Sequence, residues 1–434
     1  MKKERFKNCL IVCENKEKIL RFFEYEIVSN TMKLLTGLIL SIFLYGTAHT
    51  QGLKPIIGAE YKTEADIKTG ASQMERYLPL LKGKRVALIA NNTSLVKGTH
   101  LVDTLLKAGV DIVKVFGPEH GFRGNAPAGK YVPGERDAKT GIAVVSLYGS
   151  SKKPSPEQMA GIDIMVFDIQ DVGTRFYTYI STMSYCMEAA ADQNIPFLVL
   201  DRPNPNGHFV DGPVLEKGFE TFVGLHPVPI VHGLTVGEYA QMANGEGWLK
   251  GGKKVDLKVI PCLNYTHSDF YELPEKPSPN LNSQASIYLY PTLCLFEGTA
   301  LSVGRGTDKP FRVIGYPGWK DAPFSFTPQP MPGASDNPKY KGQLCNGYDL
   351  TEFAEEFLKN SGKLYLFWVM DAYQRYPAKD KFFTSYFNTL AGNAKLKEQI
   401  KAGVSEQEIR KSWEPALSQF KEKRKKYLLY PDFE

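Results

Sequence analysis

The chain has 434 residues, of which 43% are hydrophobic, 12% aromatic and 23% charged. This composition is that of a packed globular protein, and it excludes a disordered, collagenous or coiled-coil chain. The net charge of +6 is small. At roughly 100 to 200 residues per domain, the length predicts two domains.

The N-terminal region contains a segment typical of export. Met32-Lys33 precedes an apolar run at 34–45, and small residues follow at 46–48. The run suits the hydrophobic region of a signal peptide and is shorter than a membrane span, which needs about 20 residues; a signal anchor is the alternative. We expect a signal peptide at 32–50 and a periplasmic protein without a stable membrane span. We interpret the charged residues 1–31 as an extension upstream of the true start.

The chain that follows the signal is nearly neutral. The first 48 residues hold eight Lys/Arg and five Asp/Glu, so that +3 of the +6 remains. This balance gives no electrostatic reason to expect nucleic acid or a membrane surface as a partner. The spacing of the four later cysteines matches no metal site and favours buried thiols over a disulfide framework; they are Cys186, Cys262, Cys294 and Cys345.

Strand-like and helix-like segments alternate over residues 53–213. Apolar runs typical of buried strands lie at 85–91, 111–116, 142–147, 162–168 and 196–201. They predict a parallel sheet covered on both faces, that is, a Rossmann-like α/β domain. No G-x-G-x-x-G follows the first strand, so no dinucleotide cofactor is expected. Residues 214–434 are less regular, and we expect a smaller, separate α+β domain there.

In an open parallel sheet, ligands bind at the carboxyl ends of the strands. The loop at 116–124 holds Glu119 and His120 among three glycines and a proline. Burial of Glu119 against Phe116 and Phe122 would raise its pKa and suit it to general-acid catalysis. Its alternative is a carboxylate that caps a helix or pairs with an arginine, and the alternative for His120 is a structural hydrogen bond.

Two further loops supply candidate residues. Asp168 and Asp171 are candidate partners of Glu119, although Asp at a strand end is also a common helix cap. Cationic, aromatic and amide side chains of the type that binds sugars are further candidates. Four lie in these two loops, namely Arg175, Tyr177, Arg202 and Asn204, whereas Asn91 ends the first strand and Arg123 lies in the loop at 116–124. The aromatic residues are equally compatible with a core, and the amides with ordinary turns.

The second half offers a smaller set. Glu297 and Arg305 flank glycines in a segment that either folds over the crevice or forms a tight turn with a salt bridge. The sequence contains no G-x-S-x-G motif, so a serine nucleophile is not expected. Glu119 and His120 are adjacent, whereas two metal ligands on one face of a helix lie three or four residues apart. No metal site is therefore expected.

At these residues the sequence resembles a known family, the NamZ-type exo-β-N-acetylmuramidases, from about residue 80 to the C-terminus. The shared motifs are Leu81-Lys-Gly-Lys-Arg-Val86 leading to Asn91, Phe-Gly-Pro-Glu-His-Gly (116–121), Val-Phe-Asp-Ile-Gln-Asp-Val-Gly (166–173), Arg-Phe-Tyr-Thr-Tyr (175–179), Leu-Asp-Arg-Pro-Asn-Pro (200–205), Cys-Leu-Phe-Glu-Gly-Thr (294–299) and Gly-Arg-Gly-Thr (304–307). The resemblance implies a glycoside hydrolase that releases terminal N-acetylmuramic acid from non-reducing ends of peptidoglycan fragments. It also implies that the α+β domain closes over the cleft of the Rossmann-like domain, and that Glu119 is the catalytic carboxylate.

This implication fits the chemistry of the candidate residues. Glycoside cleavage needs an acid on the leaving oxygen and a second group that stabilises the transition state. Asp168, Asp171 or the acetamido group of the substrate is the expected second group. The lactyl carboxylate of N-acetylmuramic acid suits a bidentate arginine, for which Arg123, Arg175, Arg202 and Arg305 are candidates. The alternatives are a non-catalytic cell-wall sugar-binding protein and a hydrolase of the stem peptide.

Overall fold

The computed structural model describes residues 61–119, 121–123, 136–149, 151–356 and 358–434. The expected signal peptide, the upstream extension and His120 lie outside these residues. None of the helices in the described ranges is long and apolar enough to cross a membrane. The four cysteines named above are buried free thiols.

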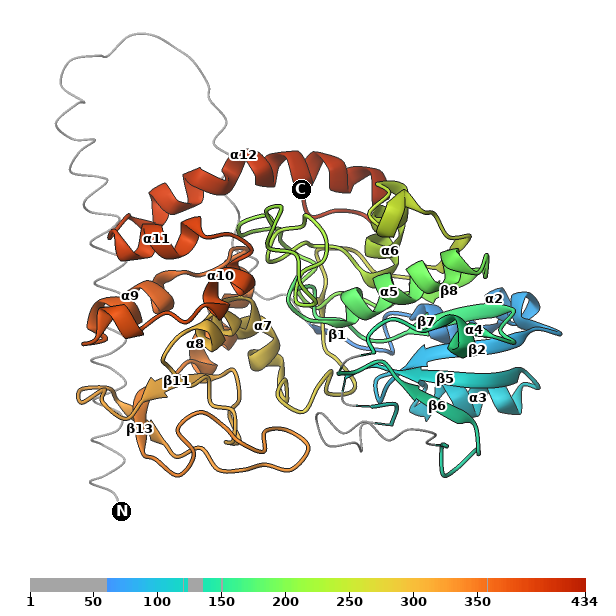
Figure 1. Ribbon diagram of the computed structural model, residues 1–434, viewed down its shortest axis with the longest axis horizontal. Coiled ribbons are helices and arrows are strands. Elements are labelled where there is room, and N and C mark those ends of the chain that lie inside the picture. The colour runs from blue at the N-terminus through green and yellow to red at the C-terminus, as the bar shows by residue number, and fades with distance from the viewer. Residues whose placement is uncertain (1–60, 120, 124–135, 150, 357) are drawn as a thin grey trace, which may run out of the picture. The chain divides into compact units, whose positions relative to one another are not determined.

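Six parallel strands form the central sheet (Figure 1). They are β2 (Arg85–Ala90), β5 (Asp111–Gly117), β6 (Ala143–Ser146), β7 (Ile164–Asp168), β8 (Phe197–Leu200) and β9 (Leu257–Ile260). Their order across the sheet is β6-β5-β2-β7-β8-β9, so chain order reverses between β2 and β7, as in a Rossmann fold. The predicted α/β class is confirmed. The last strand, β9, lies beyond residue 213, so the sheet continues past the boundary expected from the sequence.

Helices cover both faces of the sheet because the apolar side chains of its strands alternate between two cores. The covering helices are α2 (Met74–Leu81) and α3 (Leu101–Lys107) on one face, and α5 (Tyr179–Asp192) and α6 (Val236–Gly245) on the other. In β2, Val86 and Leu88 pack in the core of α2 and α3. Ala87 and Ile89 pack in the core of α5 and α6.

The rest of the chain combines helices with a small antiparallel sheet of order β11-β13-β12. Its elements are α7 (Gln284–Leu293), β11 (Val313–Tyr316), β12 (Phe324–Phe326), β13 (Cys345–Asp349), α8 (Thr351–Glu356), α9 (Phe367–Arg375), α10 (Tyr386–Ala391), α11 (Lys395–Lys401) and α12 (Glu406–Arg424). The minor elements are α4 (Pro156–Met159) and the strand pairs β1 (Tyr61–Lys62) with β10 (Phe270–Tyr271) and β3 (Leu95–Val96) with β4 (Thr99–His100). One hydrophobic core joins this part to the α5 face of the main sheet.

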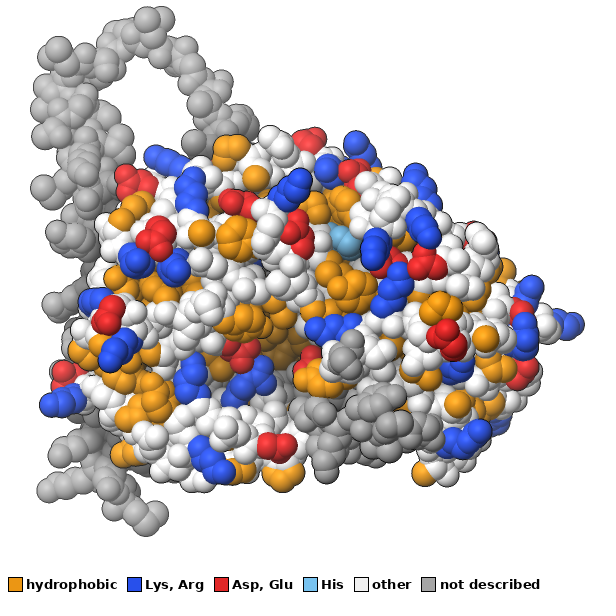
Figure 2. Space-filling model, in the orientation of Figure 1, with side chains coloured by type: hydrophobic (Ala, Val, Ile, Leu, Met, Phe, Trp, Pro, Cys, Tyr) orange, Lys and Arg blue, Asp and Glu red, His pale blue; other side chains and the backbone are white. Residues whose placement is uncertain are grey.

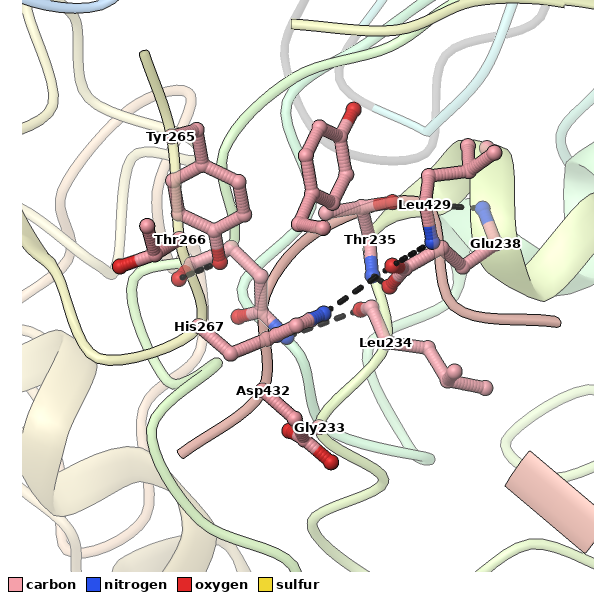
Figure 3. Close-up of polar contacts among 12 residues, drawn as sticks. Gly233, Leu234, Thr235, Glu238, Tyr265, Thr266, His267, Leu429 and Asp432 are labelled. Carbon is pink, nitrogen blue, oxygen red and sulfur yellow. Dashed lines mark hydrogen bonds and ion pairs between the residues drawn. The ribbon is translucent and has the colours of Figure 1, made fainter. Parts of the chain in front are cut away.

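The segment after α12 returns to the main sheet and is fastened there by a buried carboxylate (Figure 3). Oε1 of Glu238 accepts hydrogen bonds from the Leu429 backbone N–H at 2.8 Å and pairs with Nε2 of His267 at 3.0 Å. The Thr235 N–H donates to Oε2 of Glu238 at 2.9 Å. The side chains of Glu238 and His267 are fully buried, so this cluster stabilises the fold and is not exposed to a ligand.

Candidate functional site

The site lies at the carboxyl ends of β2, β5 and β7, where chain order reverses. Asn91 follows β2, and its Oδ1 accepts hydrogen bonds from the backbone and hydroxyl of Thr93 at 2.9 and 2.6 Å. The Thr93 hydroxyl in turn accepts from the Gln170 N–H at 2.9 Å. Asn91 thus shapes the loop that ties the end of β2 to the end of β7.

Glu119 follows β5 and is half-buried. The Thr178 hydroxyl donates to its Oε2 at 3.4 Å. The negative charge of Glu119, with burial and a hydrogen bond between the two side chains, raises the pKa of Tyr148, which follows β6. The chain turns at Gly121 with a φ of 78°, a conformation that favours glycine. The carboxylate is therefore held by its loop while it retains contact with solvent.

Side chains from the second half of the chain also influence this site. Burial raises the pKa of the Tyr386 hydroxyl, the negative charges of Glu297 and Glu119 raise it further, and the positive charge of Arg305 opposes them. Tyr386 is 39% exposed. Glu119, Glu297 and Arg305 therefore all influence the pKa of one accessible tyrosine. Figure 2 shows a hollow near the centre of this face, with charged side chains beside hydrophobic ones.

Asp168 is not open to a ligand. Its two carboxylate oxygens accept hydrogen bonds from Nε and Nη2 of Arg202 at 2.6 and 2.9 Å. The side chains of the pair are 0% and 1% exposed, and Arg202 also donates to the Leu95 carbonyl at 3.1 Å. The structure therefore corrects the expectation of a catalytic Asp168 and a ligand-binding Arg202, because each is occupied by the other.

Arg175 is also enclosed. Its terminal nitrogens donate to the carbonyls of four residues at 2.8 to 2.9 Å; these are Pro213, Val228, Leu390 and Ala391. Burial without a carboxylate partner lowers the pKa of Arg175 to about 9. The guanidinium fastens α10 to the loop before α6, so its expected role as a carboxylate receptor is replaced by a structural one.

Arg123 is occupied by two aspartates. It donates to both carboxylate oxygens of Asp137, at 2.7 and 2.8 Å, and to those of Asp103, at 3.1 and 3.3 Å. The alternative that Glu119 pairs with Arg123 is therefore not observed. Arg123 anchors the loop that carries Glu119 to α3.

Three other candidates are buried beneath the site. Oδ1 of Asp171 accepts a hydrogen bond from the Gly173 N–H at 2.7 Å, and burial raises the pKa of Asp171 to about 7. Tyr177 packs edge-on against Tyr179 with ring centres 4.8 Å apart. Asn204 donates to the Leu234 carbonyl at 2.9 Å. These contacts support the floor of the site.

Sequence reasoning missed three polar residues beside Glu119, namely Tyr148, Thr178 and Tyr386. Tyr148 follows a predicted strand, so inspection of every strand end would have found it. Tyr386 has no local signal, because α10 reaches the site only through the packing of the second half. In the described ranges, no three His, Cys, Asp or Glu side chains are arranged to hold a metal ion.

These features define an α/β protein with an acidic site where the strand order of a Rossmann fold reverses. Two family models match the chain: the N-terminal part of the exo-β-N-acetylmuramidase NamZ at residues 86–285 and its C-terminal part at 288–430. The chain belongs to the NamZ family. It is similar to the peptidoglycan β-N-acetylmuramidase NamZ of Bacillus subtilis (strain 168), with 39% identity over 424 residues that cover 92% of this chain and 100% of that protein.

Two solved structures from Bacteroides fragilis NCTC 9343 also match, both of DUF1343 family proteins. One is 45% identical with a TM-score of 0.79, and the match covers 85% of this chain and 99% of the other. The second is 32% identical with a TM-score of 0.70, over 84% and 99% of the two chains. The fold described here is therefore shared with experimental structures over nearly their whole length.

Proposed function

We propose that this protein is an exo-acting glycoside hydrolase that releases terminal N-acetylmuramic acid from non-reducing ends of peptidoglycan fragments. Membership of the NamZ family and 39% identity to a peptidoglycan β-N-acetylmuramidase support this activity. The observation that carries the mechanism is the half-buried Glu119 at the strand ends, beside Thr178 and Tyr148.

In this mechanism Glu119 is the general acid. The proton of its carboxyl group passes to the bridging oxygen as the bond from that oxygen to the anomeric carbon breaks. The Thr178 hydroxyl, at 3.4 Å from Oε2, orients the carboxyl group. Positive charge then develops on the sugar ring, and a second group must stabilise it.

The contacts of Asp168 and Asp171 limit the choice of the second group, which stabilises the positive charge on the sugar. Asp168 is closed by Arg202, and Asp171 is buried beneath the site with a pKa raised by burial to about 7. We therefore propose the acetamido group of the substrate, which lies next to the anomeric carbon in N-acetylated sugars and can act in this way. The acetamido oxygen forms a bond to the anomeric carbon as the bond to the leaving oxygen breaks. Water then attacks the anomeric carbon and displaces the acetamido oxygen, and its proton passes to the carboxylate that Glu119 has become.

We also propose that the protein is exported to the periplasm, where peptidoglycan fragments are accessible. The apolar run at 34–45 after Met32-Lys33 supports this proposal. Leu38→Arg within the run should keep the protein in the cytoplasmic fraction of its bacterium. Unchanged periplasmic recovery of this variant would contradict the proposal.

The activity is tested by mass spectrometry of a muramyl-glucosaminyl disaccharide incubated with the protein. The wild type should release free N-acetylmuramic acid, and Glu119→Gln should slow the release by about 10³-fold or more, within the range for loss of a general acid. Glu414→Gln, a change of an exposed glutamate on α12, is the matched control and should retain full activity.

Other outcomes favour other functions. Binding of the disaccharide without any turnover by the wild type would favour a sugar-binding protein. Loss of peptide from a muropeptide, with its glycan intact, would favour a stem-peptide hydrolase. Full activity of Glu119→Gln would remove Glu119 from the mechanism.

A further inference from the structure

The substrate proposed above differs from other N-acetylated sugars of the cell wall by one charged group. N-acetylmuramic acid bears a lactyl group with a carboxylate, and this group is attached to the same sugar ring whose glycosidic bond is cleaved. A guanidinium with two free N–H groups on one edge is the side chain that matches a carboxylate best. The inference below rests on the proposed function, and it concerns which residue reads this group.

Three of the four candidate arginines are already held by partners within the chain. Arg123 donates to two aspartates, Arg175 to four backbone carbonyls, and Arg202 to Asp168 and a carbonyl. Arg175 and Arg202 are also at most 2% exposed. Arg175 and Arg202 are therefore closed to a ligand by burial, and the charge of Arg123 is already balanced by two carboxylates.

Arg305 differs in both respects. Its Nε donates to Oε1 of Glu297 at 2.6 Å, and its side chain is 34% exposed. Within the described residues, its two terminal nitrogens make no hydrogen bond. Its guanidinium carbon lies 4.9 Å from the centre of the Phe311 ring, which supports one face of the planar group. One edge of the guanidinium is thus fixed by Glu297, and the other edge is open.

Ring contacts link the position of Arg305 to that of Glu119. The Phe311 ring beside Arg305 lies 4.9 Å from the ring of Tyr290, and the Tyr290 ring lies 5.7 Å from that of Tyr177. Tyr177 directly precedes Thr178, which donates a hydrogen bond to Glu119. A nearby cation, Lys339, is less suitable, because its Nζ donates to the carbonyls of Thr299 and Leu301 at 2.6 and 2.9 Å.

We infer that Arg305 binds the lactyl carboxylate of the terminal sugar and so selects muramic acid over sugars without this group. Glu297 is a positioning residue, which holds Nε and turns the open edge of the guanidinium toward the site. Phe311 fixes the plane of the group. The salt bridge between Glu297 and Arg305 therefore orients the guanidinium to bind the lactyl carboxylate, and its main role is not to stabilise a tight turn.

The test compares two substrates: p-nitrophenyl β-N-acetylmuramide and its analogue with the lactyl carboxylate converted to a primary amide. The wild type should prefer the acid by about 10- to 100-fold in kcat/KM, the range for a hydrogen bond to a charged group. Arg305→Gln should lose this preference by slowing turnover of the acid alone. Arg305→Lys, which keeps the charge without the fork, should retain part of it, and Glu297→Gln should reduce it.

Arg375→Gln is the matched control, because Arg375 pairs with Asp371 on the surface of α9 and is 54% exposed; its preference should equal that of the wild type. Equal turnover of both substrates by the wild type would overturn the inference, and this result needs no variant to fold. An unchanged preference in Arg305→Gln would overturn it as well. Absence of turnover of both substrates by the wild type would instead contradict the proposed function.

Discussion

Two of the carboxylate–arginine pairs of the chain, Asp168–Arg202 and Glu297–Arg305, have different surroundings and therefore different roles. Asp168 and Arg202 are at most 1% exposed and bonded through two hydrogen bonds, with a backbone carbonyl as a third partner. Glu297 and Arg305 share one hydrogen bond and are 23% and 34% exposed. The same residue types thus form a closed support in one place and an open receptor in the other. Exposure and the number of donors already in use decide between the two roles.

The largest expected effect is a difference between the two pairs in their contribution to the free energy of unfolding. Asp168→Ala leaves the guanidinium of Arg202 buried without its counter-charge, which should lower the free energy of unfolding by about 3–5 kcal/mol. Glu297→Ala should lower it by less than about 1 kcal/mol, since exposed pairs contribute little. Urea unfolding measures both. Equal losses in the two variants would contradict the distinction between a closed and an open pair.

The second effect concerns the protonation of Asp171, a buried carboxyl group, in contrast to the half-buried Glu119. Burial raises the pKa of Asp171 from 3.8 to about 7 in the folded protein. The folded state therefore holds this proton more tightly than the unfolded state, and stability falls as pH rises from about 4 to 7. Asp171→Asn removes this loss. Relative to wild type, the variant should gain on the order of 2–4 kcal/mol between pH 4 and pH 8.

Unfolding by urea at pH 4, 6 and 8 measures this gain. Asp380→Asn, which changes an exposed carboxylate, is the control and should show a much smaller dependence. A constant difference between Asp171→Asn and wild type over the three pH values would show that Asp171 is not held protonated by burial.

The third effect concerns the arginine that supports the site from below. Arg175→Met removes the donors of four carbonyl hydrogen bonds and should lower the free energy of unfolding by about 2–3 kcal/mol. Arg375→Met on the surface should change it by less than about 0.5 kcal/mol. If the two variants were equally stable, Arg175 would not fasten α10 to the sheet domain.

The sheet could be predicted from the sequence because its strands are buried on both faces. The apolar runs at 111–116, 142–147 and 196–201 differ by one residue at most at each end from β5, β6 and β8. The position of Glu119 at a strand end followed from the same reasoning, since the parallel arrangement fixes which loops meet. The family resemblance, confirmed by the matches to both parts of NamZ, gave the activity.

The partners of the arginines could not be predicted, because they depend on contacts between distant parts of the chain. Arg175 donates to carbonyls about 40 and 215 residues away, and backbone carbonyls leave no mark in a sequence. Asp103 and Asp137 bind Arg123 from 20 and 14 residues away. Residue type alone therefore made all four arginines equal candidates, and only the fold separates Arg305 from the others.

The central claim is that Glu119 protonates the leaving oxygen, and a comparison of leaving groups in Glu119→Gln tests it most directly. Dinitrophenolate departs without a proton, whereas a sugar alcohol requires one. The account predicts that the variant loses about 10³-fold or more in kcat/KM on the disaccharide but less than about 10-fold on the dinitrophenyl β-N-acetylmuramide. An equal loss on both substrates would contradict it, because the carboxyl group would then serve a step other than proton transfer to the departing oxygen.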